Sequence, residues 1–186
     1  MRAAGKSAGP ELRTLYGLFS PAEPLPEHEL VPADEVPEPY HRLLVHEHHM
    51  TVTVEDFHRD LVDVRILARR HDDDTYARKI VLTLQHSGRV VLFGIVRIRL
   101  GYCGDAVRAE ILEGRTPLGR ILIQHDVLRR IEPTSYLRLI ADRILMERFD
   151  LKLPRPVYGR LAIIHCDGRP AIELLEVVAP EEKAKA

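Results

Sequence analysis

An arginine in an expected strand is the side chain of this sequence best placed to do chemistry. The run from Tyr76 to Gln85 is rich in β-forming residues, and side chains of a strand alternate between its two faces. Arg78 therefore shares a face with Ile80 and Leu82. An arginine keeps its charge and an unpaired buried charge is costly, so we expect an anion to meet it. The alternatives are a bound carboxylate, an internal ion pair, and a strand-end arginine that reaches water.

Glu176 takes a similar position near the C-terminus. It shares one expected strand face with Ile172, Leu174 and Val178. Burial without a cationic partner would favour the protonated form that a general acid requires. An ion pair with a buried arginine such as Arg78 is the alternative. The opposite strand face is also apolar, so periodicity does not decide which glutamate points inward.

Two short motifs are further candidates for ligand sites. In Gly114-Arg-Thr-Pro-Leu-Gly-Arg120, Thr116 can cap a helix that has Pro117 at its first position. Free N–H groups at such a helix start can hold an anion, although an ordinary cap is the commoner outcome. The cluster His46-Glu-His48-His49-Met50 misses the HExxH zinc motif by one residue. We therefore expect a solvated histidine-rich helix and no metal site.

Hairpins and helices alternate along the chain in an order that predicts the fold class. Arg89 to Leu100 follows the first strand after a His-Ser-Gly turn, and Asp167-Gly168 is a strong signal for a second hairpin between residues 158–166 and 171–179. Without regular βαβ alternation, this order predicts an α+β fold, an antiparallel β-sheet with helices packed on one side. Another strand is expected at 61–68, a short one is compatible with 127–130, and helices are expected at 12–19, 40–49, 105–112, 118–123 and 140–149.

Prolines divide the chain into expected regions. Of the 13 prolines, 6 fall between Pro21 and Pro39, a composition that predicts an extended arm. We expect residues 1–39 to be an N-terminal extension, 40–180 the folded domain, and 181–186 a disordered tail.

Composition excludes several classes of function. The 27 basic and 28 acidic residues give a net charge of −1, which removes the electrostatic argument for nucleic acid or an anionic membrane as partner. Cys103 and Cys166 form no disulfide framework, and neither a secretory signal nor a spanning apolar run is present. No phosphate-binding glycine motif is present either. We expect a cytoplasmic monomer that binds a small molecule and uses no cofactor.

Four motifs, taken in order, resemble those of the chorismate pyruvate-lyase family over residues 40–180. That resemblance implies an internal ligand cavity under mobile flaps. It implies cleavage of chorismate to pyruvate and a hydroxybenzoate, expected to be 4-hydroxybenzoate for ubiquinone biosynthesis, without metal or organic cofactor. The motifs are Leu43-Leu-Val with His49-Met50-Thr51, Tyr76-Ala-Arg78-Lys-Ile80, Gly114 to Arg120, and Tyr158-Gly-Arg160 with Glu176-Val-Val-Ala-Pro180.

The resemblance also implies roles for the binding residues. Arg78 corresponds to the arginine that binds a substrate carboxylate. Met50 and Leu118 correspond to residues whose backbone amides line the same pocket, with Gly119 beside Leu118. Arg160 is a candidate for holding the second carboxylate of chorismate.

The catalytic residues implied by the resemblance are Glu176, which would face the ring hydroxyl, and Arg78. Arg120 is a further candidate for binding the second carboxylate of chorismate. Two non-enzymatic alternatives remain. Effector-binding domains of bacterial transcription regulators look similar in fold, but the roughly 40 residues before the core are too few and too acidic for the winged-helix reader that normally precedes them. The other alternative is a structural protein whose arm docks a partner.

Overall fold

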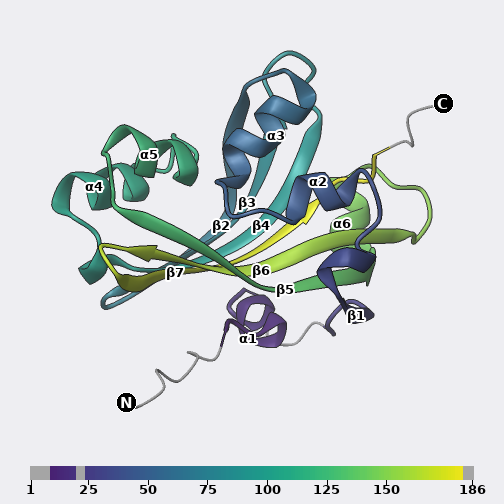
Figure 1. Ribbon diagram of the computed structural model, residues 1–186, viewed down its shortest axis with the longest axis horizontal. Helices are drawn as coiled ribbons and strands as arrows, with labels where there is room; N and C mark the ends of the chain where they lie inside the picture. Colours follow the sequence, from purple (N-terminus) through teal and green to yellow (C-terminus); the bar gives the residue numbers. More distant parts are fainter. Residues whose placement is uncertain (1–8, 20–23, 182–186) are drawn as a thin grey trace.

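A seven-stranded antiparallel sheet forms the centre of the computed structural model, which describes residues 9–19 and 24–181. The strand order is β1-β5-β6-β7-β4-β3-β2 (Figure 1). The expected α+β class with an antiparallel sheet is confirmed. The strands are β1 (His28–Val31), β2 (Val62–Asp72), β3 (Thr75–Leu84), β4 (Val90–Arg99), β5 (Arg129–Ile140), β6 (Pro156–Cys166) and β7 (Arg169–Val178). The α-helices are α1 (Leu12–Gly17), α2 (Tyr40–Leu44), α3 (Met50–His58), α4 (Asp105–Glu113), α5 (Leu118–Gln124) and α6 (Arg143–Arg148).

Both expected hairpins are confirmed. Strands β3 and β4 pair antiparallel, as do β6 and β7. Between β6 and β7, Asp167 has φ 50° and Gly168 has φ 77°. Two consecutive residues of positive φ match the twist of the flanking strands, which is why Asp-Gly is favoured in such a turn.

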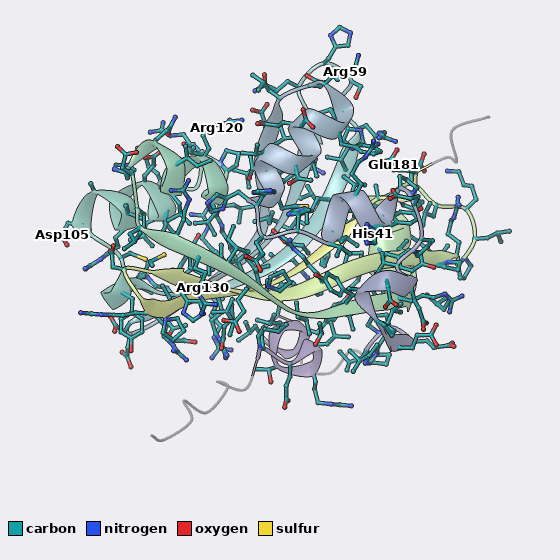
Figure 2. The ribbon with its side chains drawn as sticks, in the orientation of Figure 1. His41, Arg59, Asp105, Arg120, Arg130 and Glu181 are labelled. Atoms are coloured by element: carbon teal, nitrogen blue, oxygen red, sulfur yellow. The ribbon has the colours of Figure 1, made fainter. Side chains whose placement is uncertain are left out.

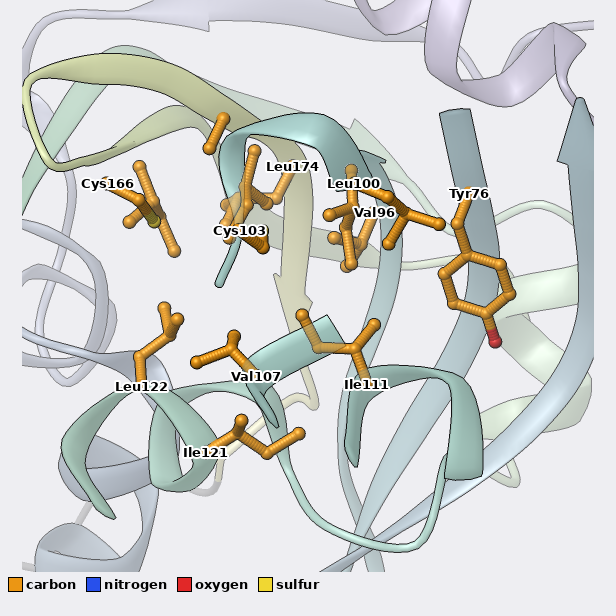
Figure 3. Packing of buried hydrophobic residues seen from close by; sticks show 14 of the residues in the cluster. Tyr76, Val96, Leu100, Cys103, Val107, Ile111, Ile121, Leu122, Cys166 and Leu174 are labelled. Carbon is orange, nitrogen blue, oxygen red and sulfur yellow. The ribbon is translucent and has the colours of Figure 1, made fainter. Parts of the chain in front are cut away.

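Helices α2 to α5 cover one face of the sheet. Val107 and Ile111 of α4, with Ile121 and Leu122 of α5, point toward sheet residues such as Leu174 (Figure 3). Helices α2 and α3 cover the neighbouring part of the same face through a second buried cluster. This helical face carries the candidate site.

The expectation that helices pack on one side only is wrong for α1 and α6. Leu15 of α1 and Leu145 of α6 are buried against the opposite face, where they join Phe93 and Val177. Figure 1 shows α1 on the side of the sheet away from α3, α4 and α5. Central strands of this sheet are apolar on both faces, so each face needs a covering layer.

The N-terminal segment contributes to the sheet as well as to its cover. The sequence reasoning missed β1, which pairs with β5 at the edge of the sheet. Pro26 and Pro32 flank this strand, and an edge strand tolerates neighbouring prolines because one of its sides has no partner. The boundary at residue 40 stays a prediction. Of the expected tail, residues 182–186 lie outside the described residues, while Glu181 pairs with Arg89 at 3.0 Å.

Two further elements differ from expectation. Strand β5 extends as far as Ile140, the residue at which a helix was expected to start, and a bulge lies between Pro133 and Ser135. Helix α6 begins only at Arg143, where the Asp142 side chain accepts a hydrogen bond from the Leu145 backbone N–H at 2.8 Å. Among the described residues, no helix is both long enough and apolar enough to cross a membrane.

Docking of α1 predicts a clear stability difference between two leucines of the N-terminal segment. Leu15 is 0% exposed, whereas Leu30 on β1 is 70% exposed. Leu15→Ala should lower the free energy of unfolding by about 2–4 kcal/mol, and Leu30→Ala by less than about 0.5 kcal/mol. Chemical denaturation of both variants measures this. Equal, small effects would show that α1 is not packed on the sheet.

Candidate functional site

An enclosed cavity lies on the helical face, at the seam between the two buried clusters. Its volume is about 50 Å³. A single water needs roughly 10–15 Å³ on a comparable measure, so the cavity can hold several waters or the head of a small molecule. We call it the inner cavity. Its walls are mostly apolar, and its polar lining residues are His49, Thr51, Arg78, Arg160 and Glu176.

Arg78 lies in the inner cavity, and no carboxylate of residues 9–19 or 24–181 forms an ion pair with it. Its side chain is 1% exposed, and its Nε and Nη1 atoms are buried with no hydrogen-bond partner among the described residues. Burial lowers the pKa of the guanidinium. A buried cation without a partner is costly, so this arrangement fits a group that waits for an anion. The face assigned to Arg78 by periodicity is confirmed, while its role stays a prediction.

Arg160 and Glu176 form an ion pair in the wall of the same cavity. Arg160 Nε donates to Glu176 Oε2 at 2.7 Å, and the two side chains are 1% and 13% exposed. The other two nitrogens of Arg160 donate to backbone carbonyls of the segment before α3, those of Leu44, His46 and His48. Arg160 therefore fixes the chain that leads into α3.

The general-acid assignment of Glu176 is wrong, because its premise was burial without a cationic partner. The partner is Arg160 and not Arg78, for a reason that lies in the sheet register. Glu176 stands directly opposite Arg160 on β6, whereas β4 separates β7 from β3. Gly94 of β4 is the residue opposite Glu176 on that side.

Two helix N-termini meet at the inner cavity. Met50 and Thr51 begin α3, and Leu118 and Gly119 begin α5; all of them line the cavity. The first backbone N–H groups of a helix have no intrahelical acceptor and add positive potential at that end. A Cβ on Gly119 would lie 2.9 Å from Thr51 Oγ1, so only glycine allows the two helix starts to approach this closely.

Two expectations about the segment before α5 are wrong. Pro117, not Thr116, is the N-cap of α5, and no side chain caps the helix. Arg120 does not point into the cavity but pairs with Glu55 of α3, consistent with its place between α5 and α3 in Figure 2. Its charge is already compensated there, and it holds the two helices together.

The histidine cluster does not form the expected helix, because α2 ends at Leu44 and α3 begins at Met50. The His46 ring contacts Leu43 O and accepts a hydrogen bond from the His48 backbone N–H. Within the described part of the chain, no group of three or more acidic, histidine or cysteine side chains could hold a metal.

His49 is a cavity residue that the sequence reasoning missed. It is 7% exposed, lines the inner cavity, and its Nε2 accepts from Arg129 Nε at 2.6 Å. Its position directly before Met50 was the only available signal. The contact with Arg129 spans 80 residues of sequence and could not be read from a local pattern.

Comparison with known proteins places the fold. No protein-family model matches the chain, and no curated protein matches it in sequence. In structure, the chain is similar to PhnF from Mycobacterium smegmatis, with a TM-score of 0.57, 9% identity, and coverage of 94% of this chain and 100% of that one. It is also similar to the ligand-binding domain of a putative GntR-family transcriptional regulator from Bordetella bronchiseptica, with a TM-score of 0.50, 14% identity, and coverage of 65% of this chain and 87% of that one. At these identities, the similarity establishes the fold only.

The assignment to the chorismate pyruvate-lyase family is therefore wrong. One of the solved structures that the chain resembles is described as the ligand-binding domain of a putative transcriptional regulator, and neither of the two is described as a lyase. The predictions that depended on this assignment are wrong as well. They are the lyase activity, chorismate as substrate, 4-hydroxybenzoate and pyruvate as products, and a place in ubiquinone biosynthesis. The catalytic roles of Arg78 and Glu176 fall with that assignment. What the structure brings into one cavity is Met50, Arg78, Leu118, Gly119, Arg160 and Glu176.

The buried Arg160–Glu176 pair predicts a large loss of stability when one partner is neutralised. Glu176→Gln leaves Arg160 buried without a counter-ion and should lower the free energy of unfolding by about 3 kcal/mol. The control is Glu173→Gln, which breaks the more exposed pair between Glu173 of β7 and Arg97 of β4 and should cost about 1 kcal/mol or less. Denaturant titration compares them. Equal costs would argue against a strongly buried pair.

Two neutral histidines predict a pH dependence of stability. Burial, with the nearby Arg129, lowers the pKa of His49 from 6.5 to about 4, and burial with Arg160 does the same for His46. Between pH 6.5 and 4 the unfolded chain takes up protons that the folded chain does not, so stability is complete above pH 6.5 and falls as the pH drops through this range.

Denaturant unfolding at several pH values measures this effect. His49→Gln should reduce the slope in that range by up to about 1.4 kcal/mol per pH unit. His86→Gln, at an exposed turn position, should leave the slope unchanged. An unaltered slope in the His49 variant would contradict a neutral buried imidazole.

Proposed function

We propose that this chain is a non-catalytic binding domain for a small acidic molecule, with a carboxylate of the ligand paired to Arg78. The observation that carries the proposal is the guanidinium itself, which is buried at the cavity wall with two nitrogens lacking partners among the described residues. A guanidinium matches a carboxylate in a bidentate geometry. A ligand carboxylate would therefore supply the missing counter-ion.

The rest of the inner cavity supports the same ligand chemistry. The starts of α3 and α5 add N–H groups and positive potential at one side. Apolar side chains supply most of the remaining wall and suit an aromatic or aliphatic body; among them are Ile80, Leu82, Leu92, Ile131 and Leu174. The Arg160–Glu176 pair is neutral overall and leaves Arg78 as the uncompensated charge.

The structural similarity supports binding over catalysis. One similar structure is described as the ligand-binding domain of a putative transcriptional regulator. A domain of that kind needs to hold a molecule and respond to it, without breaking a bond. Glu176 accepts a hydrogen bond from Arg160, and this contact agrees with a binding role for the domain.

Arg78→Met tests the proposal through two opposite effects. Binding of benzoate or hexanoate, measured by calorimetry, should be lost, because the charge-assisted hydrogen bonds are gone. Stability of the ligand-free chain should stay the same or rise, by about 1–4 kcal/mol, because an uncompensated buried charge is replaced by an apolar side chain. A structural arginine would behave in the opposite way.

Arg65→Met is the matched control, since Arg65 is an exposed residue of the adjacent strand β2. It should bind both acids as the parent does. The proposal fails if the parent binds neither acid at millimolar concentration, or if Arg78→Met binds them as well as the parent.

A further inference from the structure

A second hollow adjoins the inner cavity and shares two of its lining residues. Its volume is about 410 Å³, and it is more open to solvent than the inner cavity. His49 and Ile131 line both hollows, so they form the partition between them. We call the second hollow the outer groove; its other lining residues are Glu47, His48, Val52, Ile123, Arg129 and Arg130.

The inner cavity is too small to enclose a ligand of ordinary size, and the adjoining outer groove offers room for the remainder of such a ligand. Ligand pockets commonly measure roughly 300–1,000 Å³, and the inner cavity, at about 50 Å³, is much smaller. It can take the acidic head of a molecule but not a large body. The outer groove has the required volume, and the exposed side chains of Val52 and Ile123 give it apolar walls.

Arg129 is a second arginine for which the described residues supply no counter-ion, and it lies at the partition. Its Nε donates to His49 Nε2 at 2.6 Å and its Nη1 to Val127 O at 3.0 Å. Both acceptors are neutral, because the pKa of His49 is lowered to about 4 by burial and by Arg129 itself. Among the described residues no carboxylate contacts Arg129, including Glu47 in the same groove. Two of its nitrogens are thus fixed in position, while its charge remains uncompensated.

The neighbouring Arg130 shows the contrast. It lines the same groove but pairs with Glu132 at 2.9 Å, and it also contacts His165. The Arg130 side chain is 63% exposed, on strand β5 (Figure 2). The two adjacent arginines therefore differ in what they can offer a ligand, because only one already has an anionic partner.

We propose that the outer groove is a second anion subsite, in which Arg129 binds the distal acidic group of a ligand whose first acidic group pairs with Arg78. The preferred ligands are therefore elongated molecules with an acidic group at each end. This inference rests on the proposed function, because it takes Arg78 as the inner anchor. His49 fixes the Arg129 guanidinium between the two subsites, and its own Nδ1 has no partner among the described residues.

Calorimetry with matched pairs of probes tests the second subsite. Benzoate is compared with terephthalate, and hexanoate with adipate, so that each pair differs by one carboxylate. The parent chain should bind the diacid of at least one pair about tenfold more tightly or better, the ratio expected for one charge-assisted contact. The preference should weaken as salt is raised.

Three variants assign that preference to a residue. In Arg129→Gln, the affinities for the diacid and the matching monoacid should differ by less than about twofold, while the monoacid binds as in the parent. Arg129→Lys should restore part of the preference for the diacid. Arg130→Gln is the matched control and should leave the ratio unchanged. Circular dichroism and thermal unfolding check that each variant is folded.

The outcomes separate this inference from the proposed function. Equal affinity of the parent for both members of each pair overturns the second subsite, as does a diacid preference that survives Arg129→Gln or disappears in Arg130→Gln. Loss of all binding in Arg78→Met, with the diacid ratio lost in Arg129→Gln and kept in Arg130→Gln, supports both proposals. Unchanged binding in Arg78→Met overturns the inner anchor, and no binding of any probe by the parent overturns both.

Discussion

Two guanidinium groups are buried on the same face of one sheet, and the described residues supply a carboxylate to only one of them. Arg160 is paired with Glu176 and hydrogen-bonded to three backbone carbonyls. Arg78 lies in the same cavity with neither. Since a buried charge is stable only when it is paired, the difference between these two arginines defines what the cavity lacks. The proposal that a ligand carboxylate binds in the inner cavity follows from this difference.

Several residues around the cavity place the N-termini of α3 and α5 beside Arg78. Arg160 fixes the segment before α3 and thereby places the N-terminus of that helix at the cavity. Gly119 lets α5 approach the same point, and Arg120 pairs with Glu55 to hold the two helices together. The ion pairs of this region hold the helices in place. As a result, the N-termini of α3 and α5, with their positive potential, lie at the same cavity as the Arg78 guanidinium.

Two kinds of similarity bear on this chain. The solved structures establish its fold, whereas the motif resemblance to a lyase family concerned its function. Four short motifs lie in the expected order, and each of them contributes residues to the lining of this cavity. One fold can carry many functions, so the site has to be argued from its own side chains. The structure pairs Glu176 with Arg160, so its carboxylate lacks the unpartnered environment on which its interpretation as a general acid depended.

Strand periodicity by itself placed Arg78 and Glu176 on apolar faces, and turn chemistry located both hairpins, because alternation and turn formation depend only on residues close in sequence. Pairing across the sheet was decided by the tertiary structure. Because β4 lies between β3 and β7, Glu176 pairs with Arg160 of β6, and within the described part of the chain no carboxylate pairs with Arg78. The contact of His49 with Arg129 and the cover of the opposite face by α1 likewise join residues far apart in the chain. Such contacts depend on strand order and packing, which no local pattern encodes.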